Sequence, residues 1–161
     1  MKTTNMKDNQ RLRKLFEDHF EGEPWIDVQI WNAIKDLPYA DAAKNVYGLN
    51  SIWQMVQHMA SWRQTLLRRL TGEHIPSPAN NYFEPIPVIN EQAWQNTLQQ
   101  LRHSQEALLN YLESGIQMDE VQPGSSYSRY ELLQGLLQHD AYHLGQIVLV
   151  RKLISIGFTP Q

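Results

Sequence analysis

Glycine and proline divide this 161-residue chain into segments whose apolar residues recur with helical spacing, and this pattern limits the possible folds most. In four long segments the apolar residues return every three or four positions, which is the period of one face of an α-helix. No run shows the period-two alternation, bounded by turn residues, that is typical of a half-buried strand. The sequence therefore predicts an all-α protein. Long helices are expected over residues 9–20, 51–71, 90–113 and 128–154, with a shorter helical stretch over 26–37.

The expected helix ends carry capping signals. Asn50 or Ser51 is the expected N-cap of the second long helix, and Gln54 stands at the right spacing from Ser51 for a capping box. Ser128 and Glu131 offer the same pair at the start of the fourth long helix. These signals fix where the two helices should begin.

The lengths of the expected helices and of their connections predict a four-helix bundle. A helix of about 20 residues spans about 30 Å, and helices of matching length with one apolar stripe each are typical of such bundles. The proline-rich connection over residues 73–89 is long enough to cross the whole bundle at about 3.3 Å per residue. The second and third helices are therefore expected to run parallel, joined by a long crossover. We expect a single domain over residues 1–161.

Composition excludes several classes of function. A net charge of −3 and a pI near 6.0 argue against a nucleic-acid-binding protein, and the cluster Arg63, Arg68 and Arg69 is interpreted as the solvated face of one helix. Without cysteine there is no disulfide, thiolate zinc site or protein thiol nucleophile. The polar segment Met1–Arg13 does not resemble a signal peptide, and no apolar run approaches the ~20 residues of a membrane span. We expect a cytoplasmic protein that acts on a small molecule, with no nucleic-acid or membrane partner.

Two histidines four positions apart are the most informative feature of the fourth long helix. Side chains at this spacing lie one above the other, with Cβ atoms ~5–6 Å apart, so His139 and His143 can reach one metal ion. Both fall in the same arc as Leu136, Gln146 and Val150, which is expected to face the interior. The spacing leaves open the alternative of two buried histidines bonded to backbone or carboxylate groups.

A third candidate ligand, His58, lies near the middle of the second long helix at the edge of its apolar stripe. Helix bundles build metal sites from side chains on facing helices, and three imidazoles leave a position open for water or substrate. His74 and His103 fall off the apolar stripes and are expected to be solvated. His19, on the inner face of the first helix, is interpreted as a core residue or a distal ligand.

Three segments resemble motifs of the DinB/YfiT-like superfamily of metal-dependent enzymes. Residues 138–147 read Gln-His-Asp-Ala-Tyr-His-Leu-Gly-Gln-Ile and resemble the signature of that superfamily. Ser51-Ile52-Trp53 leading to His58 and then Trp62, together with Pro24-Trp25, is similar to its other hallmarks. The resemblance extends over about residues 10–155.

This resemblance implies a four-helix bundle of up-down-down-up topology and a divalent metal ion (zinc, nickel or manganese) held by His58, His139 and His143. It also implies thiol chemistry, because characterised relatives include bacillithiol transferases, a mycothiol-dependent maleylpyruvate isomerase and the small domain of ergothioneine-forming enzymes. In such enzymes the metal binds a low-molecular-weight thiol and lowers its pKa. The leading hypothesis is therefore a metal-dependent thiol S-transferase or hydrolase.

Further residues near the histidines are candidates for catalytic roles. Gln146 and Tyr142 flank the pair and can orient a ligand, although filling the core is the simpler interpretation of Tyr142. Asp140 points about 100° away from His139, so it is interpreted as a hydrogen-bonding partner behind the site or between helices. Trp53, Trp62 and Trp25 line a pocket or belong to the core.

The alternative is a non-catalytic metal- or ligand-binding bundle that forms a homodimer. The fourth long helix is apolar nearly all round, and a helix with that pattern needs a partner on each side. The residues beyond its inner arc are Leu133, Leu137, Leu144, Val148 and Leu149. A homodimer is expected on this basis.

Overall fold

The computed structural model describes residues 7–157, and all the regular secondary structure over that range is helical, as the sequence predicts. Its helices are α1 (Asp8–Phe20), α2 (Ile30–Ile34), α3 (Tyr39–Ala42), α4 (Ile52–Leu70), α5 (Glu91–Glu113) and α6 (Arg129–Ser155). Extended pairing within the described residues is limited to one isolated bridge between Val121 and Ser128. The segment Met1–Arg13, for which no signal peptide is expected, begins outside the described residues. No helix within residues 7–157 is long and apolar enough to cross a membrane.

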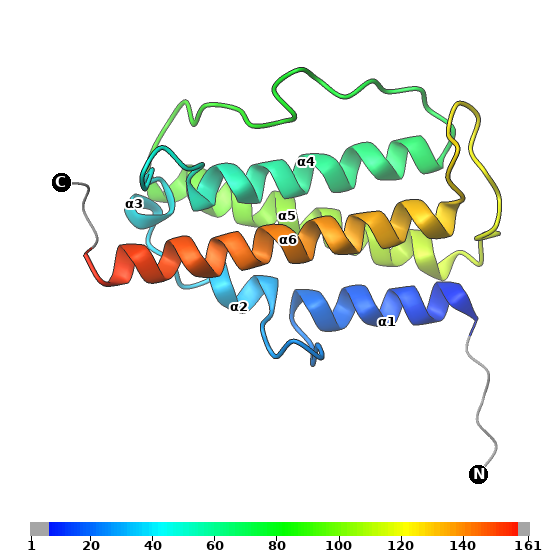
Figure 1. The fold of residues 1–161 in the computed structure, drawn as a ribbon, viewed down its shortest axis with the longest axis horizontal. Helices are drawn as coiled ribbons and strands as arrows, with labels where there is room; N and C mark the ends of the chain where they lie inside the picture. Colours follow the sequence, from blue (N-terminus) through cyan, green and yellow to red (C-terminus); the bar gives the residue numbers. More distant parts are fainter. Residues whose placement is uncertain (1–6, 158–161) are drawn as a thin grey trace, which may run out of the picture.

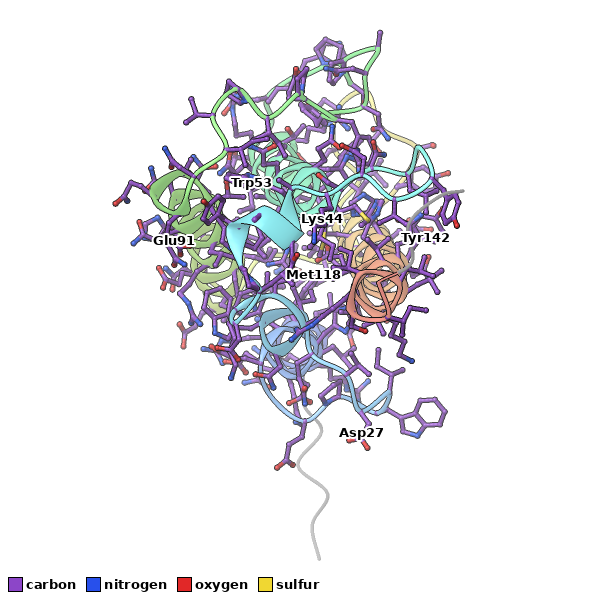
Figure 2. All side chains as sticks on the ribbon, turned by 90° about the vertical axis from the view of Figure 1, so that its left-hand side faces the viewer. Asp27, Lys44, Trp53, Glu91, Met118 and Tyr142 are labelled. Carbon is purple, nitrogen blue, oxygen red and sulfur yellow. The ribbon has the colours of Figure 1, made fainter. Side chains whose placement is uncertain are left out.

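The four long helices lie side by side, with their axes close to parallel (Figure 1). Helices α4 and α5 run in one direction, whereas α1 and α6 run in the other. The connection between α4 and α5 passes back along the outside of α4 (Figure 1). Viewed end-on, the four long helices surround a common interior (Figure 2), and α4 contacts both α5 and α6. The middle of α4 therefore faces the middle of α6.

Local sequence signals set the helix ends. Ser51 caps α4 and Ser128 caps α6, each in a reciprocal capping box with the residue three positions later. Gly72, at φ +96°, follows the end of α4, and its N–H donates to the carbonyl of Arg69. A side chain would be strained at this angle, so glycine is suited to that position.

The short helical stretch expected over residues 26–37 is helical only from Ile30 to Ile34, so its predicted start is wrong. A turn precedes it, in which the N–H of Asp27 donates to the carbonyl of Pro24. Asp27 has φ +61° and Gln29 is extended, and neither conformation can belong to a right-handed helix.

Buried polar side chains separate the apolar interior into two clusters. One cluster includes α4 residues up to Ala60, and the other includes α4 residues from Leu66 onward. Arg63 lies between them with no exposed surface, so its interpretation as part of a solvated helix face is wrong. Arg68, in the same predicted cluster, is exposed as expected. The buried cation requires buried partners, and these lie directly behind the histidines.

Candidate metal centre

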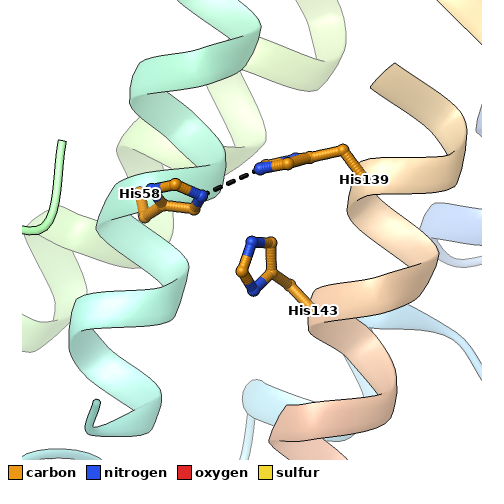
Figure 3. Close-up of side chains that lie close together, drawn as sticks. All are labelled: His58, His139 and His143. Atoms are coloured by element: carbon orange, nitrogen blue, oxygen red, sulfur yellow. Dashed lines mark hydrogen bonds between the residues drawn. The ribbon is translucent and has the colours of Figure 1, made fainter. Parts of the chain in front are cut away.

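Helices α4 and α6 bring the three predicted histidines together (Figure 3). His58 projects from the middle of α4, while His139 and His143 project from successive turns of α6. One ring nitrogen from each residue lies within 4.8 Å of the other two, and the Nε2 atoms of His58 and His139 are 2.8 Å apart. His58 and His143 are buried and His139 is half-buried. The group is therefore shielded by protein yet open at His139.

Hydrogen bonds at the far side of two rings determine which nitrogen is free. Nδ1 of His58 lies 2.7 Å from the backbone carbonyl of Asn81, and Nδ1 of His143 lies 2.7 Å from Oε1 of Gln146. Both partners are acceptors, so both Nδ1 atoms carry the proton and each Nε2 keeps a lone pair. Figure 3 shows the free nitrogen of His143 directed toward the other two rings. Contacts of this kind orient histidines that bind metals.

The third ring faces a carboxylate. Nδ1 of His139 and Oδ1 of Asp140 are 3.5 Å apart, and both are buried without a hydrogen-bond partner among the described residues. A proton on Nδ1 of His139 satisfies this arrangement electrostatically and leaves a lone pair on its Nε2. Two lone pairs would then oppose each other across the 2.8 Å between His58 and His139, which is unfavourable unless a cation lies between them. The donor set thus fits a metal ion.

Asp140 of α6 forms a buried ion pair with Arg63 of α4. This contact between helices agrees with the prediction that Asp140, which points away from the His139 face, bonds behind the site or between helices. Nε and Nη2 of Arg63 lie 2.9 and 2.8 Å from Oδ2 of Asp140, and neither side chain is exposed. Nη1 of Arg63 donates to Gln105 of α5, which in turn donates to the carbonyl of Phe16 in α1. Burial would raise the pKa of Asp140, but the charge and hydrogen bonds of Arg63, together with the neighbouring His139, outweigh burial and lower that pKa. The carboxylate behind His139 is therefore ionised.

Burial also keeps two of the histidines neutral. It lowers the pKa of His58 to about 4, a shift that the neighbouring imidazoles increase. Burial lowers the pKa of His143 as well, with His139 adding to the effect. Imidazole binds metals only in its neutral form, so both rings are ready ligands at neutral pH.

The loop between α4 and α5 contributes contacts that sequence reasoning did not foresee. Besides its carbonyl contact with His58, Asn81 accepts a hydrogen bond from Trp62 through its side-chain oxygen, at 3.1 Å. Asn81 and Tyr82 both have positive φ, at 51° and 61°, which turns the chain over the middle of α4. Phe83 then stacks on His58, with ring centroids 4.0 Å apart and planes 10° apart. The sequence feature that could have predicted this turn is Asn81 itself, because asparagine tolerates a positive φ and lies in the loop that crosses α4.

The other predicted site residues have mixed outcomes. Gln146 touches His143, as described, but Tyr142 is 64% exposed and points outward (Figure 2), so the expectation that it fills the core is wrong. Trp53 belongs to the core, where its indole N–H donates to Thr97. Trp25 is 98% exposed and lies neither in a pocket nor in the core, contrary to both interpretations.

The remaining histidines stay apart from the cluster. His74 and His103 are exposed, as predicted. His19 is buried on α1, where burial lowers its pKa and the charge of Asp140 partly opposes that shift. His19 is therefore a core residue behind the ion pair, which agrees with the first of its two interpretations.

A cavity of about 620 Å³ opens onto the three histidines. Its other lining residues include Tyr142, Gln146, Phe83 and Leu149. Apart from the histidines, Tyr142 is the one residue with a titratable side chain among the described residues that line it. The volume is typical of a site for a small organic molecule.

A helical protein with three convergent imidazoles at the base of a cavity has a donor set that could hold a metal ion, and helical proteins build such sites from side chains on facing helices. The chain is a member of the DinB superfamily, whose family model matches residues 10–147. Neither the curated proteins nor the solved structures include a match to this chain.

Proposed function

We propose that this protein is a metal-dependent enzyme of the thiol S-transferase type, built on a four-helix bundle of up-down-down-up topology. His58, His139 and His143 would hold a divalent zinc, nickel or manganese ion. The observation that carries the proposal is the 2.8 Å between the Nε2 atoms of His58 and His139, with Nδ1 of His58 against the carbonyl of Asn81 and Nδ1 of His139 facing Asp140. Membership of the DinB superfamily supports it.

The bound ion would lower the pKa of a low-molecular-weight thiol, and the chain's own residues would hold and orient the ligands. Asn81 and Gln146 keep two imidazoles in the tautomer that presents Nε2. Asp140, ionised beside His139, would hold that ring in place through its Nδ1. Tyr142, at the rim of the cavity, offers a hydroxyl to an incoming substrate.

The lining of the cavity favours thiol transfer over hydrolysis. A metal ion lowers the pKa of bound water as well as that of a thiol. The difference lies in the group that passes the water's proton to the leaving group, usually a carboxylate that acts as general base and then as general acid. The described residues that line the cavity include no carboxylate, and Asp140 is fully buried behind His139. A thiol whose pKa is lowered below the ambient pH is already deprotonated and needs no such base. Hydrolase activity is therefore the less favoured form of the proposal.

The first test is elemental analysis of protein purified without an affinity tag. We expect the wild type to carry about one transition metal per chain and His58→Ala to carry almost none. His103→Ala removes an exposed imidazole from α5 and is the matched control, with metal content like that of the wild type. Equal metal content in all three proteins would contradict the proposal.

The second test is S-alkylation of low-molecular-weight thiols by monobromobimane. In this reaction a carbon–sulfur bond forms, the carbon–bromine bond breaks and the thiol proton is released to solvent. We expect the wild type to accelerate the reaction with at least one thiol and His143→Ala to abolish the acceleration. A metal-loaded wild type that accelerates none of these reactions would favour the alternative, a non-catalytic metal-binding bundle that forms a homodimer.

A further inference from the structure

A second cavity adjoins the histidines on the opposite side of His139. It extends from His139 toward the start of α6, whereas the first cavity extends toward the end of α6. His139 lines both, so the two cavities meet at that ring. The second cavity has a volume of about 560 Å³, which is within the range of small-molecule sites.

The walls of this second cavity are largely apolar. Helix α4 contributes Trp62 and Leu66, and α6 contributes Leu132 and Leu136. The ring of Trp62 lies edge-on to that of His139, with centroids 6.0 Å apart. An apolar group held against Trp62 would therefore lie beside the proposed metal ligand.

One cation in the second cavity has no anionic partner among the described residues. Nε and Nη2 of Arg69 donate to the neutral carbonyl of Ile75 at 2.9 and 2.5 Å, and the guanidinium lies 5.4 Å from the centre of the Trp62 ring. Glu131 lines the same cavity, but its carboxylate accepts from the backbone and hydroxyl of Ser128 at 2.7 and 2.8 Å. The cavity thus combines apolar walls with a guanidinium beside the ring of Trp62, while the Glu131 carboxylate is held by Ser128 at the start of α6.

We propose that the second cavity binds an aromatic carboxylic acid, with its ring between α4 and α6 and its carboxylate on Arg69. The ring would extend toward His139. Arg69 supplies the positive charge beside Trp62, and guanidinium binds carboxylate through charge-assisted hydrogen bonds. That this acid is the organic substrate of the metal centre rests on the proposed function, whereas its binding depends on the cavity alone.

Calorimetric titration with 2-naphthoate tests this proposal, and the neutral alcohol 2-naphthalenemethanol is the matched probe. We expect Arg69→Gln to weaken the binding of naphthoate about tenfold, because a charge-assisted hydrogen bond contributes on the order of 1.5 kcal/mol. Binding of the alcohol should be unchanged in this variant. Equal affinities of Arg69→Gln and the wild type for naphthoate would overturn the assignment of Arg69.

Two glycines of α6 provide a steric test that does not endanger the fold. A Cβ added at Gly135 or at Gly145 meets no atom within 4 Å, but only Gly135 lines the second cavity. Gly135→Leu should fill the cavity and weaken both probes at least tenfold, whereas Gly145→Leu should bind them like the wild type. Equal probe affinities in the two leucine variants would overturn the proposed cavity. Helical circular dichroism should be retained in both, because leucine favours helix more than glycine does.

The same titration separates this proposal from the proposed function. Naphthoate should bind to His143→Ala and to protein treated with a chelator, since neither change alters Arg69 or the apolar walls. Loss of metal with naphthoate binding retained is the expected result for His143→Ala. Bound metal in the wild type without naphthoate binding would overturn the second cavity and leave the metal centre standing.

Discussion

The buried ion pair behind His139 gives the most demanding prediction. Arg63 and Asp140 have no exposed surface, and two guanidinium nitrogens lie within 2.9 Å of one carboxylate oxygen. Arg63→Met leaves the carboxylate buried and uncompensated, which costs about 3–5 kcal/mol. This is a large part of the ~5–15 kcal/mol by which a domain is stable. At about 2–4 °C per kcal/mol, the Tm should fall by about 10 °C.

The pH dependence of this variant has a definite sign. In the wild type the charge of Arg63 lowers the pKa of Asp140, so protonation of Asp140 removes stability only below its ordinary value of 3.8. In Arg63→Met burial loses its main opposing influence, so that pKa rises. The stability deficit of the variant should therefore shrink as the pH falls from 7 toward 4, because Asp140 then becomes neutral. Denaturant unfolding followed by circular dichroism at pH 7 and pH 4.5 measures this deficit.

Two further variants complete the experiment. Arg63→Met combined with Asp140→Leu removes both charges and should recover most of the lost stability. Arg68, which lies on α4 like Arg63, is a solvent-exposed partner of Glu73, and Arg68→Met should leave the unfolding free energy unchanged. If Arg63→Met were as stable as Arg68→Met at pH 7, the reasoning about the buried pair would be refuted.

Three further predictions concern the histidines and a helix cap. Gln146→Leu should weaken metal binding about 10–100-fold in a competition assay with a chelating dye, because it removes the acceptor for Nδ1 of His143. In metal-free protein the unfolded chain binds more protons than the folded one between pH 6.5 and about 4, since the pKa of His58 is lowered. The free energy of unfolding should therefore fall by about 3 kcal/mol as the pH is lowered from 6.5 to about 4, and urea titration at a series of pH values measures this fall. Ser128→Ala should cost about 1 kcal/mol in the same titration at pH 7, because it removes the cap of α6.

Each of these predictions has a control. Gln134→Leu changes a glutamine on the same helix whose side chain hydrogen-bonds Tyr130 rather than a histidine, so it should bind metal like the wild type. His58→Gln should reduce the dependence of stability on pH between 6.5 and 4, with His143 and His19 accounting for what remains, and an unchanged slope would contradict the assignment to His58. Ser128→Asp retains a capping oxygen and should be about as stable as the wild type.

The sequence by itself determined the four long helices, the caps of α4 and α6 and the shared direction of His139 and His143. Helix ends depend on residues within four positions of one another, as in the Ser51–Gln54 and Ser128–Glu131 pairs, and such contacts form wherever the local chain is helical. The spacing of His139 and His143 likewise fixes their shared direction through the helical repeat. The crossover loop follows from its length, since a long connection allows α4 and α5 to run parallel (Figure 1).

Only the tertiary structure decided the burial of Arg63, the contact of Asn81 with His58 and the exposure of Tyr142. Arg63 meets a carboxylate 77 positions away, and Asn81 meets its histidine through a backbone carbonyl that carries no side-chain signature. Helix α6 is apolar nearly all round, so its pattern does not distinguish the inner arc from the flank that carries Tyr142. Local periodicity fixes which residues of a helix share a face, whereas the neighbouring helices determine which face is covered. The charges, rings and cavities of this site lie where one helix meets the next, so only the tertiary structure places them.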